Sequence, residues 1–161
     1  MEQGTRNKGE RGAEAQGFRG LVAWQKADEL ALAVFRALNN ASSAPRWLAV
    51  QAMRAAISVP ANVAEGYTRG SLGDYLRFID IARGSLAELE YYLLFIDRER
   101  LLPAEQTQNL QRLQQDTGRL LHGLWKSLKE KSKNGTWDRT GRISEERAAY
   151  ITDPSLEEEL E

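Results

Sequence analysis

Residues 51–90 read QAMRAAISVPANVAEGYTRGSLGDYLRFIDIARGSLAELE, and two helical patterns meet in this stretch across a short turn. The first pattern has almost no solvent face, because at 100° per residue its polar side chains fall in one stripe about 80° wide. That stripe consists of Gln51, Arg54, Ser58, Asn62, Glu65 and Arg69. A surface helix normally carries an apolar stripe on a polar cylinder. The reversed pattern predicts that this helix is covered on two sides, by its own core and by a partner chain.

The second pattern, which follows the turn, has a continuous apolar stripe with Arg83 and Glu90 at its edge. Gly84 lies in the middle of this helix, where glycine costs roughly 1 kcal/mol relative to alanine. We therefore expect a neighbouring backbone to pack closely against Gly84. Gly66, at the end of the first pattern, is a candidate helix terminator.

Two further helical patterns flank this stretch, and together they predict four helices. The boundaries are set by caps and prolines: Ser71 is a good N-cap, and Pro45 and Pro103 suit first helical turns. Pro60 lies inside the second helix, where we expect a kink without a break, with Ser58 or Asn62 bonding the carbonyl of Ala56 that proline frees. The predicted helices run from Gly20 to Leu38, from Ser43 or Ala44 to the turn, from Ser71 or Leu72 to Asp97 or later, and from Pro103 past Leu128.

The chain of 161 residues is long enough for one domain. We predict an all-α, up-down-up-down antiparallel four-helix bundle over residues 18–128. Residues 1–17 and 129–161 lack sustained apolar periodicity and are predicted to be disordered or largely so. The charge is uneven, because residues 18–128 carry 13 Lys and Arg against 11 Asp and Glu, whereas residues 129–161 carry 6 against 9.

Composition limits the cellular setting and the chemistry. Cysteine is absent, the polar N-terminus does not have the apolar segment of a signal peptide, and no apolar run has the ~18 residues of a membrane span. These features predict a cytoplasmic protein that does not enter membranes. The net charge of −1 gives no overall attraction to nucleic acid.

The sequence offers no pattern typical of an enzyme. His122 is the single histidine, so the paired Glu-x-x-His motifs of di-iron bundles are missing. Neither common glycine-rich phosphate loop occurs. We therefore predict no catalytic residues, no metal, no cofactor and no small-molecule substrate.

The charged and polar residues of the central stretch have two interpretations. One is a ligand or nucleic-acid pocket. The other, which we favour, is a buried hydrogen-bonded network that fixes how the second and third helices pair, since buried charges must be paired. If the pairs are buried, truncating one member is expected to cost roughly 3–5 kcal/mol. The residues of this network are Arg54, Ser58, Asn62, Glu65, Arg83 and Glu90.

A second set of residues consists of cations without an assigned apolar position. They are candidates for contacts to RNA phosphates, although a solvated surface is the interpretation that we favour. No RNA-recognition, KH or zinc-knuckle signature accompanies them. In an oligomer, a weak basic strip on each chain would join into a continuous band. These residues are Arg69, Arg77, Arg119, Lys126 and Lys129.

Three ordered motifs resemble those of a bacterial family. They are LVAWQKA at residues 21–27, RAAISVPANVAEG at residues 54–66 and ARGSLAELE at residues 82–90. The chain resembles the four-helix-bundle proteins encoded by intervening sequences in 23S ribosomal RNA genes. A related group acts as the accessory variability determinant of diversity-generating retroelements. This resemblance implies a homo-oligomer, by analogy a pentamer, associated with RNA or a reverse transcriptase.

Two functions from different classes remain open. The first is a non-enzymatic oligomer that associates with RNA or a nucleoprotein, and salt-dependent retention on RNA would favour it. The second is a structural scaffold or protein-interaction module with no nucleic-acid role. Loss of a protein partner on deletion of residues 130–161 would favour the second.

Overall fold

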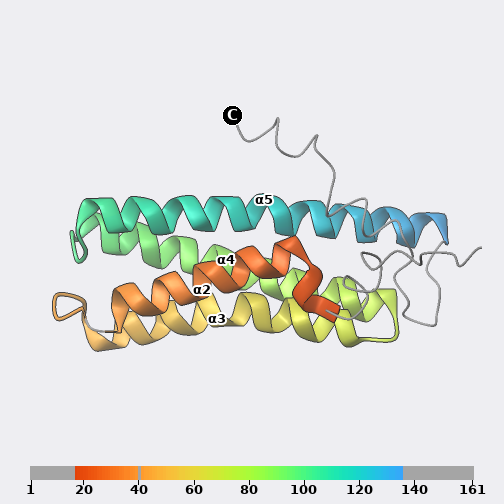
Figure 1. The fold of residues 1–161 in the computed structure, drawn as a ribbon, viewed down its shortest axis with the longest axis horizontal. Coiled ribbons are helices and arrows are strands. Elements are labelled where there is room, and N and C mark those ends of the chain that lie inside the picture. Colours follow the sequence, from red (N-terminus) through yellow and green to blue (C-terminus); the bar gives the residue numbers. More distant parts are fainter. Residues whose placement is uncertain (1–16, 40, 136–161) are drawn as a thin grey trace, which may run out of the picture.

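The computed structural model describes residues 17–39 and 41–135, which form a short 3-10 helix and four α-helices. Each α-helix packs against its neighbours in sequence, and α2 also packs against α5, which closes the bundle. Figure 1 shows the four helices side by side along one common axis. The predicted all-α, antiparallel four-helix bundle is confirmed. The elements are η1 Gly17–Gly20, α2 Val22–Leu38, α3 Arg46–Thr68, α4 Leu72–Arg98 and α5 Ala104–Asn134.

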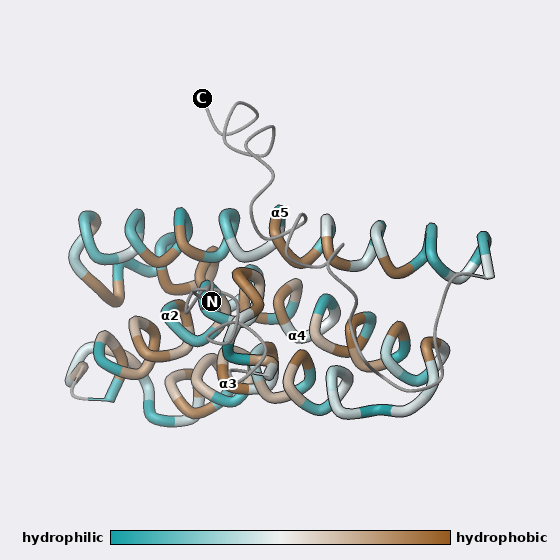
Figure 2. The backbone as a smooth tube through the Cα atoms, turned by 45° about the vertical axis from the view of Figure 1, so that its right-hand side comes forward, coloured by the Kyte–Doolittle hydropathy of each residue, from teal (hydrophilic) through white to brown (hydrophobic). Residues whose placement is uncertain are grey.

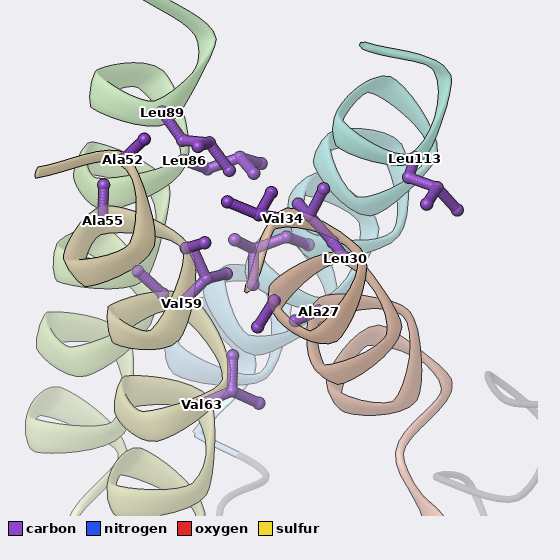
Figure 3. Close-up of a cluster of buried hydrophobic side chains, with 14 of the residues drawn as sticks. Ala27, Leu30, Val34, Ala52, Ala55, Val59, Val63, Leu86, Leu89 and Leu113 are labelled. Carbon is purple, nitrogen blue, oxygen red and sulfur yellow. The ribbon is translucent and has the colours of Figure 1, made fainter. Parts of the chain in front are cut away.

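The core forms where the apolar stripes of all four helices meet. α4 and α5 contribute mainly large aliphatic side chains, whereas α2 and α3 each contribute several alanines. Small side chains allow helix axes to approach closely, and α3 and α4 make the most extensive helix–helix contact in the bundle. Figure 3 shows side chains that gather in this core, among them Ala27, Leu30, Val34, Ala52, Ala55, Val59, Val63, Leu86, Leu89 and Leu113.

Two glycines have roles different from those predicted. Gly66 does not terminate its helix, because α3 continues to Thr68. It is buried at a close approach of α4, where an added Cβ would lie 2.8 Å from Cδ2 of Tyr75 and 2.9 Å from Cβ of Phe78. The expectation of close packing at Gly84 is wrong for the single chain, since Gly84 is exposed and no described atom of another element lies within 4 Å of an added Cβ.

The helix boundaries follow the predicted local chemistry. The Ser71 hydroxyl accepts a hydrogen bond from the backbone N–H of Asp74 at 3.1 Å, which confirms the N-cap. α3 runs through Pro60 without a break. The Asn62 amide donates to the carbonyl of Ser58 at 2.7 Å, and not to that of Ala56 as expected. This choice follows helix geometry, since a side chain reaches the carbonyl four residues before it.

The last helix extends beyond the predicted end of the bundle. α5 continues six residues past position 128 and ends at Asn134, where Gly135 adopts a left-handed conformation with φ 64°. Glycine takes this conformation without a Cβ penalty and so terminates helices readily. The predictions of disorder at residues 1–16 and 136–161 fall on parts of the chain outside the described residues.

Candidate nucleic-acid interface

A line of exposed basic side chains runs along the C-terminal half of α5. At 100° per residue, its members fall within about 80° of the helix surface and span about 21 Å of its axis. All of them are exposed, and Figure 2 shows α5 alternating between hydrophilic and hydrophobic segments along its length. Between positions 119 and 134 the helix carries five Lys and Arg residues, one histidine and one acidic residue. We call this line the basic stripe, and it consists of Arg119, His122, Lys126, Lys129 and Lys133.

An aromatic pair is embedded in the basic stripe. The rings of His122 and Trp125 stack with centroids 5.7 Å apart and an interplanar angle of 23°. The guanidinium of Arg83, from α4, lies 4.6 Å from the Trp125 ring centroid, and the Lys129 ammonium lies 5.4 Å from it. Cations at these distances are attracted to the negative face of an indole. The cluster therefore joins α4 to α5 and leaves the His122 ring exposed at the surface.

The other two predicted RNA contacts lie near the turn between α3 and α4. Arg69 forms an ion pair with Glu65, and its guanidinium lies 4.7 Å from the Phe78 ring centroid. Arg77 is exposed on the first part of α4. Figure 1 shows this turn at the same end of the bundle as the C-terminal end of α5. All five predicted cations are thus exposed; Arg69, Arg77, Lys126 and Lys129 lie toward one end of the bundle, and Arg119 lies at the middle of α5.

The uncharged members of the predicted polar network do meet between α3 and α4. The hydroxyls of Ser58 and Ser85 lie 2.9 Å apart, and the Asn62 amide donates to the Ser58 hydroxyl at 3.0 Å. All three side chains are half-buried. Ser85 is therefore the α4 partner in this network.

The four charged members do not pair with one another within the chain, which differs from the predicted network. Arg83 bonds Asp80 at 3.2 Å, and Glu90 accepts a hydrogen bond from Gln114 at 3.4 Å. The physical reason is that Arg83 and Glu90 lie on the edge of α4 that faces α5, not α3.

The large loss of stability predicted for truncating a charged member of the network required that its side chain be buried, and none of the four charged side chains is fully buried. Arg54, Glu65 and Glu90 are exposed, and Arg83 is half-buried. The Glu65–Arg69 ion pair is also largely exposed. Exposed ion pairs typically contribute about 0–1 kcal/mol, so the ~3–5 kcal/mol of a buried pair is not expected within the single chain.

Other chemistry is sparse among the described residues. No group of three or more His, Cys, Asp or Glu side chains in residues 17–39 and 41–135 is arranged to hold a metal ion. Within the same residues, no helix has the length and apolar character that crossing a membrane requires. A hydrogen bond from the Tyr92 hydroxyl to Glu88 at 2.8 Å raises the pKa of Tyr92. This pair lies on α4, outside the basic stripe.

Two members of the basic stripe were missing from the predicted RNA contacts. Lys133 continues the seven-residue spacing of Arg119 and Lys126, and this spacing alone identifies it. His122 was not among the predicted contacts, because the sequence does not reveal its stacking on Trp125. The contact of Arg83 with Trp125 joins two helices and has no local sequence signal.

The fold and the basic stripe define a class: a small antiparallel four-helix bundle with one basic, largely polar outer helix. Within that class, residues 19–123 match the model of the 23S rRNA-intervening sequence protein family. The match covers more than half of the chain, and the protein therefore belongs to this family. The resemblance drawn from the three motifs is confirmed.

A solved structure supports the same fold. It is a protein of unknown function from the S23 ribosomal protein family of Bacteroides thetaiotaomicron VPI-5482. The two chains share 24% sequence identity with a TM-score of 0.60, and the alignment covers 65% of this chain and 99% of the other. At this identity the likeness shows the fold alone. No curated protein matches the chain.

Proposed function

We propose that this protein is a non-enzymatic, cytoplasmic oligomer that associates with RNA through the basic stripe of α5. One observation carries the proposal: the exposed cations of α5 lie along a single line of the helix. The family to which the chain belongs is described as that of the 23S rRNA-intervening sequence proteins. Lysine and arginine bind phosphates by releasing condensed counterions, which requires charge at the surface but no enzyme chemistry. The description of the family names no catalytic activity.

The distribution of exposed apolar side chains supports α5, and not α2, α3 or α4, as the RNA-facing helix. Each of α2, α3 and α4 carries large apolar side chains on its outer surface, whereas α5 carries none among the described residues. Phosphate binding favours a polar, hydrated surface, and apolar outer faces favour protein contacts. The exposed large apolar residues are Leu32, Phe35, Trp47, Ile57, Ile81, Tyr91 and Leu94.

RNA binding is expected to depend steeply on salt. If the four Lys and Arg residues of the basic stripe contact the phosphates of a single strand, the slope of log K against log salt should be roughly −3. Binding should then be about 60-fold weaker at 200 mM salt than at 50 mM salt. Fluorescence anisotropy with a labelled RNA at several salt concentrations measures this slope. Binding that does not respond to salt, or no binding at 50 mM salt, contradicts the proposal.

The apolar outer faces support the proposed homo-oligomer, for which the resemblance suggests five subunits. Ile57 is 53% exposed and Ala61 is also exposed, so the largely apolar α3 is not fully covered by its own chain. A second chain packed on α3 would bury this surface, with a gain of roughly 25 cal/mol per Å² of apolar area. In a closed ring, the basic stripes of all subunits would add to one RNA-binding surface.

Substitution of Ile57 by glutamate is expected to break the oligomer, because it places a charge in the proposed interface. The parent should have a mass about five times the 18.1 kDa of one chain, and the Ile57→Glu variant should be a helical monomer. Light scattering with circular dichroism at equal protein concentration measures both. Gln51→Glu, which adds the same charge on the polar stripe of α3, is the matched control. A monomeric parent contradicts this prediction.

The alternative is a structural scaffold that binds other proteins and has no nucleic-acid role. The seven exposed large apolar side chains favour it, since such residues suit a partner protein, a reverse transcriptase included. An oligomer that forms normally but fails to bind RNA at low salt would select this alternative.

A further inference from the structure

A hollow between α4 and α5 borders the basic stripe and has a volume of about 530 Å³. Five of its lining residues come from α5 and one from α4, and the hollow is open to solvent. Two basic-stripe residues, Arg119 and His122, belong to its wall. The lining residues are Glu90, Gln114, Gln115, Gly118, Arg119 and His122.

We propose that this hollow receives one unpaired base of single-stranded RNA, stacked on His122, while the adjacent phosphates contact the basic stripe. The proposal rests on the RNA association proposed above and assigns a position and a strand type to it.

The His122 ring is suited to stacking. It is exposed to solvent, and its parallel contact with Trp125 restricts its orientation. Trp125 in turn is held by the cations of Arg83 and Lys129. A ring with a fixed orientation loses little entropy when a base stacks on it. Proteins that bind single strands use such aromatic side chains as platforms, and every base offers a π face to them.

The remaining lining groups suit the polar edge of a base. Glu90 offers carboxylate oxygens, and Gln115 is exposed and offers both an amide donor and a carbonyl acceptor. The hydrogen bond from Gln114 to Glu90 is long, at 3.4 Å, so a ligand donor can compete for the carboxylate.

Arg119 connects the hollow to the phosphate contacts. Its ion pair with Asp116 occupies part of a guanidinium group that has five N–H donors in total. From Arg119 the basic stripe continues along α5 through Lys126 and Lys129, on the same surface as His122. A strand with one base in the hollow can therefore extend its phosphates along the helix.

The geometry favours a single strand over a duplex. In A-form RNA the bases are paired and stacked, and the deep major groove does not admit side chains that would read base edges. A base enters a side hollow only when it is unpaired, as in a loop or at a strand end. A duplex would use the phosphate contacts alone.

The test compares two ligands that differ in whether they carry bases. Affinities of the full chain and of His122→Ala are measured for a single-stranded RNA of about 12 nucleotides and for inorganic polyphosphate of similar charge. His122→Ala is expected to weaken RNA binding at least about 5-fold, because one base–aromatic stack is lost. Polyphosphate binding should not change, and His122→Phe, which keeps a ring, should bind RNA like the parent.

Each outcome separates this inference from the proposed function. If His122→Ala weakens the binding of RNA and of polyphosphate equally, or leaves RNA binding unchanged, the base site is overturned and phosphate binding by the basic stripe remains. Failure of His122→Phe to retain RNA affinity also overturns stacking as the mechanism. A parent that binds neither ligand overturns both the base site and the RNA association. Equal melting temperatures of the variants and the parent check that folding is unchanged.

Discussion

Gly66→Ala is expected to destabilise the bundle by about 2 kcal/mol, whereas Gly84→Ala should stabilise it by up to about 1 kcal/mol. Both substitutions remove the same glycine penalty from a helix interior. At Gly66 the new Cβ meets Tyr75, which is 1% exposed, and the Cβ of Phe78, which moves only with the α4 backbone. At Gly84 no described atom of another element lies within 4 Å of the new Cβ. The difference between the two variants therefore measures the steric cost at Gly66.

Thermal and urea unfolding at one fixed protein concentration test this pair, since oligomerisation makes stability depend on concentration. For a bundle of this size, a loss of about 2 kcal/mol lowers the melting temperature by roughly 5–10 °C. A Gly66→Ala variant as stable as the parent contradicts the close approach of α4. A Gly84→Ala variant that loses both stability and subunits would place a partner's backbone against Gly84, as the sequence pattern suggested.

Local chemistry predicted the helices, but not the contacts between them. Ser71 and Pro103 marked helix starts because caps and prolines act within one turn of the chain. The importance of Gly66 was missed, because it depends on Tyr75 and Phe78 of the facing helix. Glycine spacing in one helix carries no information about the side chains opposite.

In the candidate site, too, the sequence predicted the exposure of single residues but not the contacts between helices. The five predicted RNA-binding cations are all exposed, because charged residues outside an apolar stripe rarely fold inward. The charged network was not predictable in the same way. Arg83 and Glu90 flank one apolar stripe, and only the packed bundle shows that they face Trp125 and Gln114 of α5.

Removal of three charges from the basic stripe is expected to have the largest effect on RNA affinity. For a single strand, each phosphate contact contributes about 0.7 to the slope of log K against log salt. Between 1 M and 0.1 M salt, each contact therefore strengthens binding by about 5-fold. The triple variant Lys126→Gln, Lys129→Gln and Lys133→Gln should therefore bind RNA about 100-fold more weakly at 0.1 M salt, with a slope smaller by about 2. Folding should be nearly unaffected, since all three side chains are exposed and only the contact of Lys129 with the Trp125 ring is lost.

A matched triple variant removes the same charge elsewhere: Arg36→Gln, Arg46→Gln and Arg98→Gln. These arginines are exposed near the C-terminal ends of α2 and α4 and the N-terminal end of α3, which lie at the end of the bundle opposite to the C-terminal end of α5. Both variants change the net charge of the chain equally, so a long-range effect of net charge would weaken binding equally in both. Contact with phosphates predicts that only the α5 variant loses affinity and salt slope. Equal losses in the two variants, or a larger loss in the control, would exclude α5 as the RNA-binding surface.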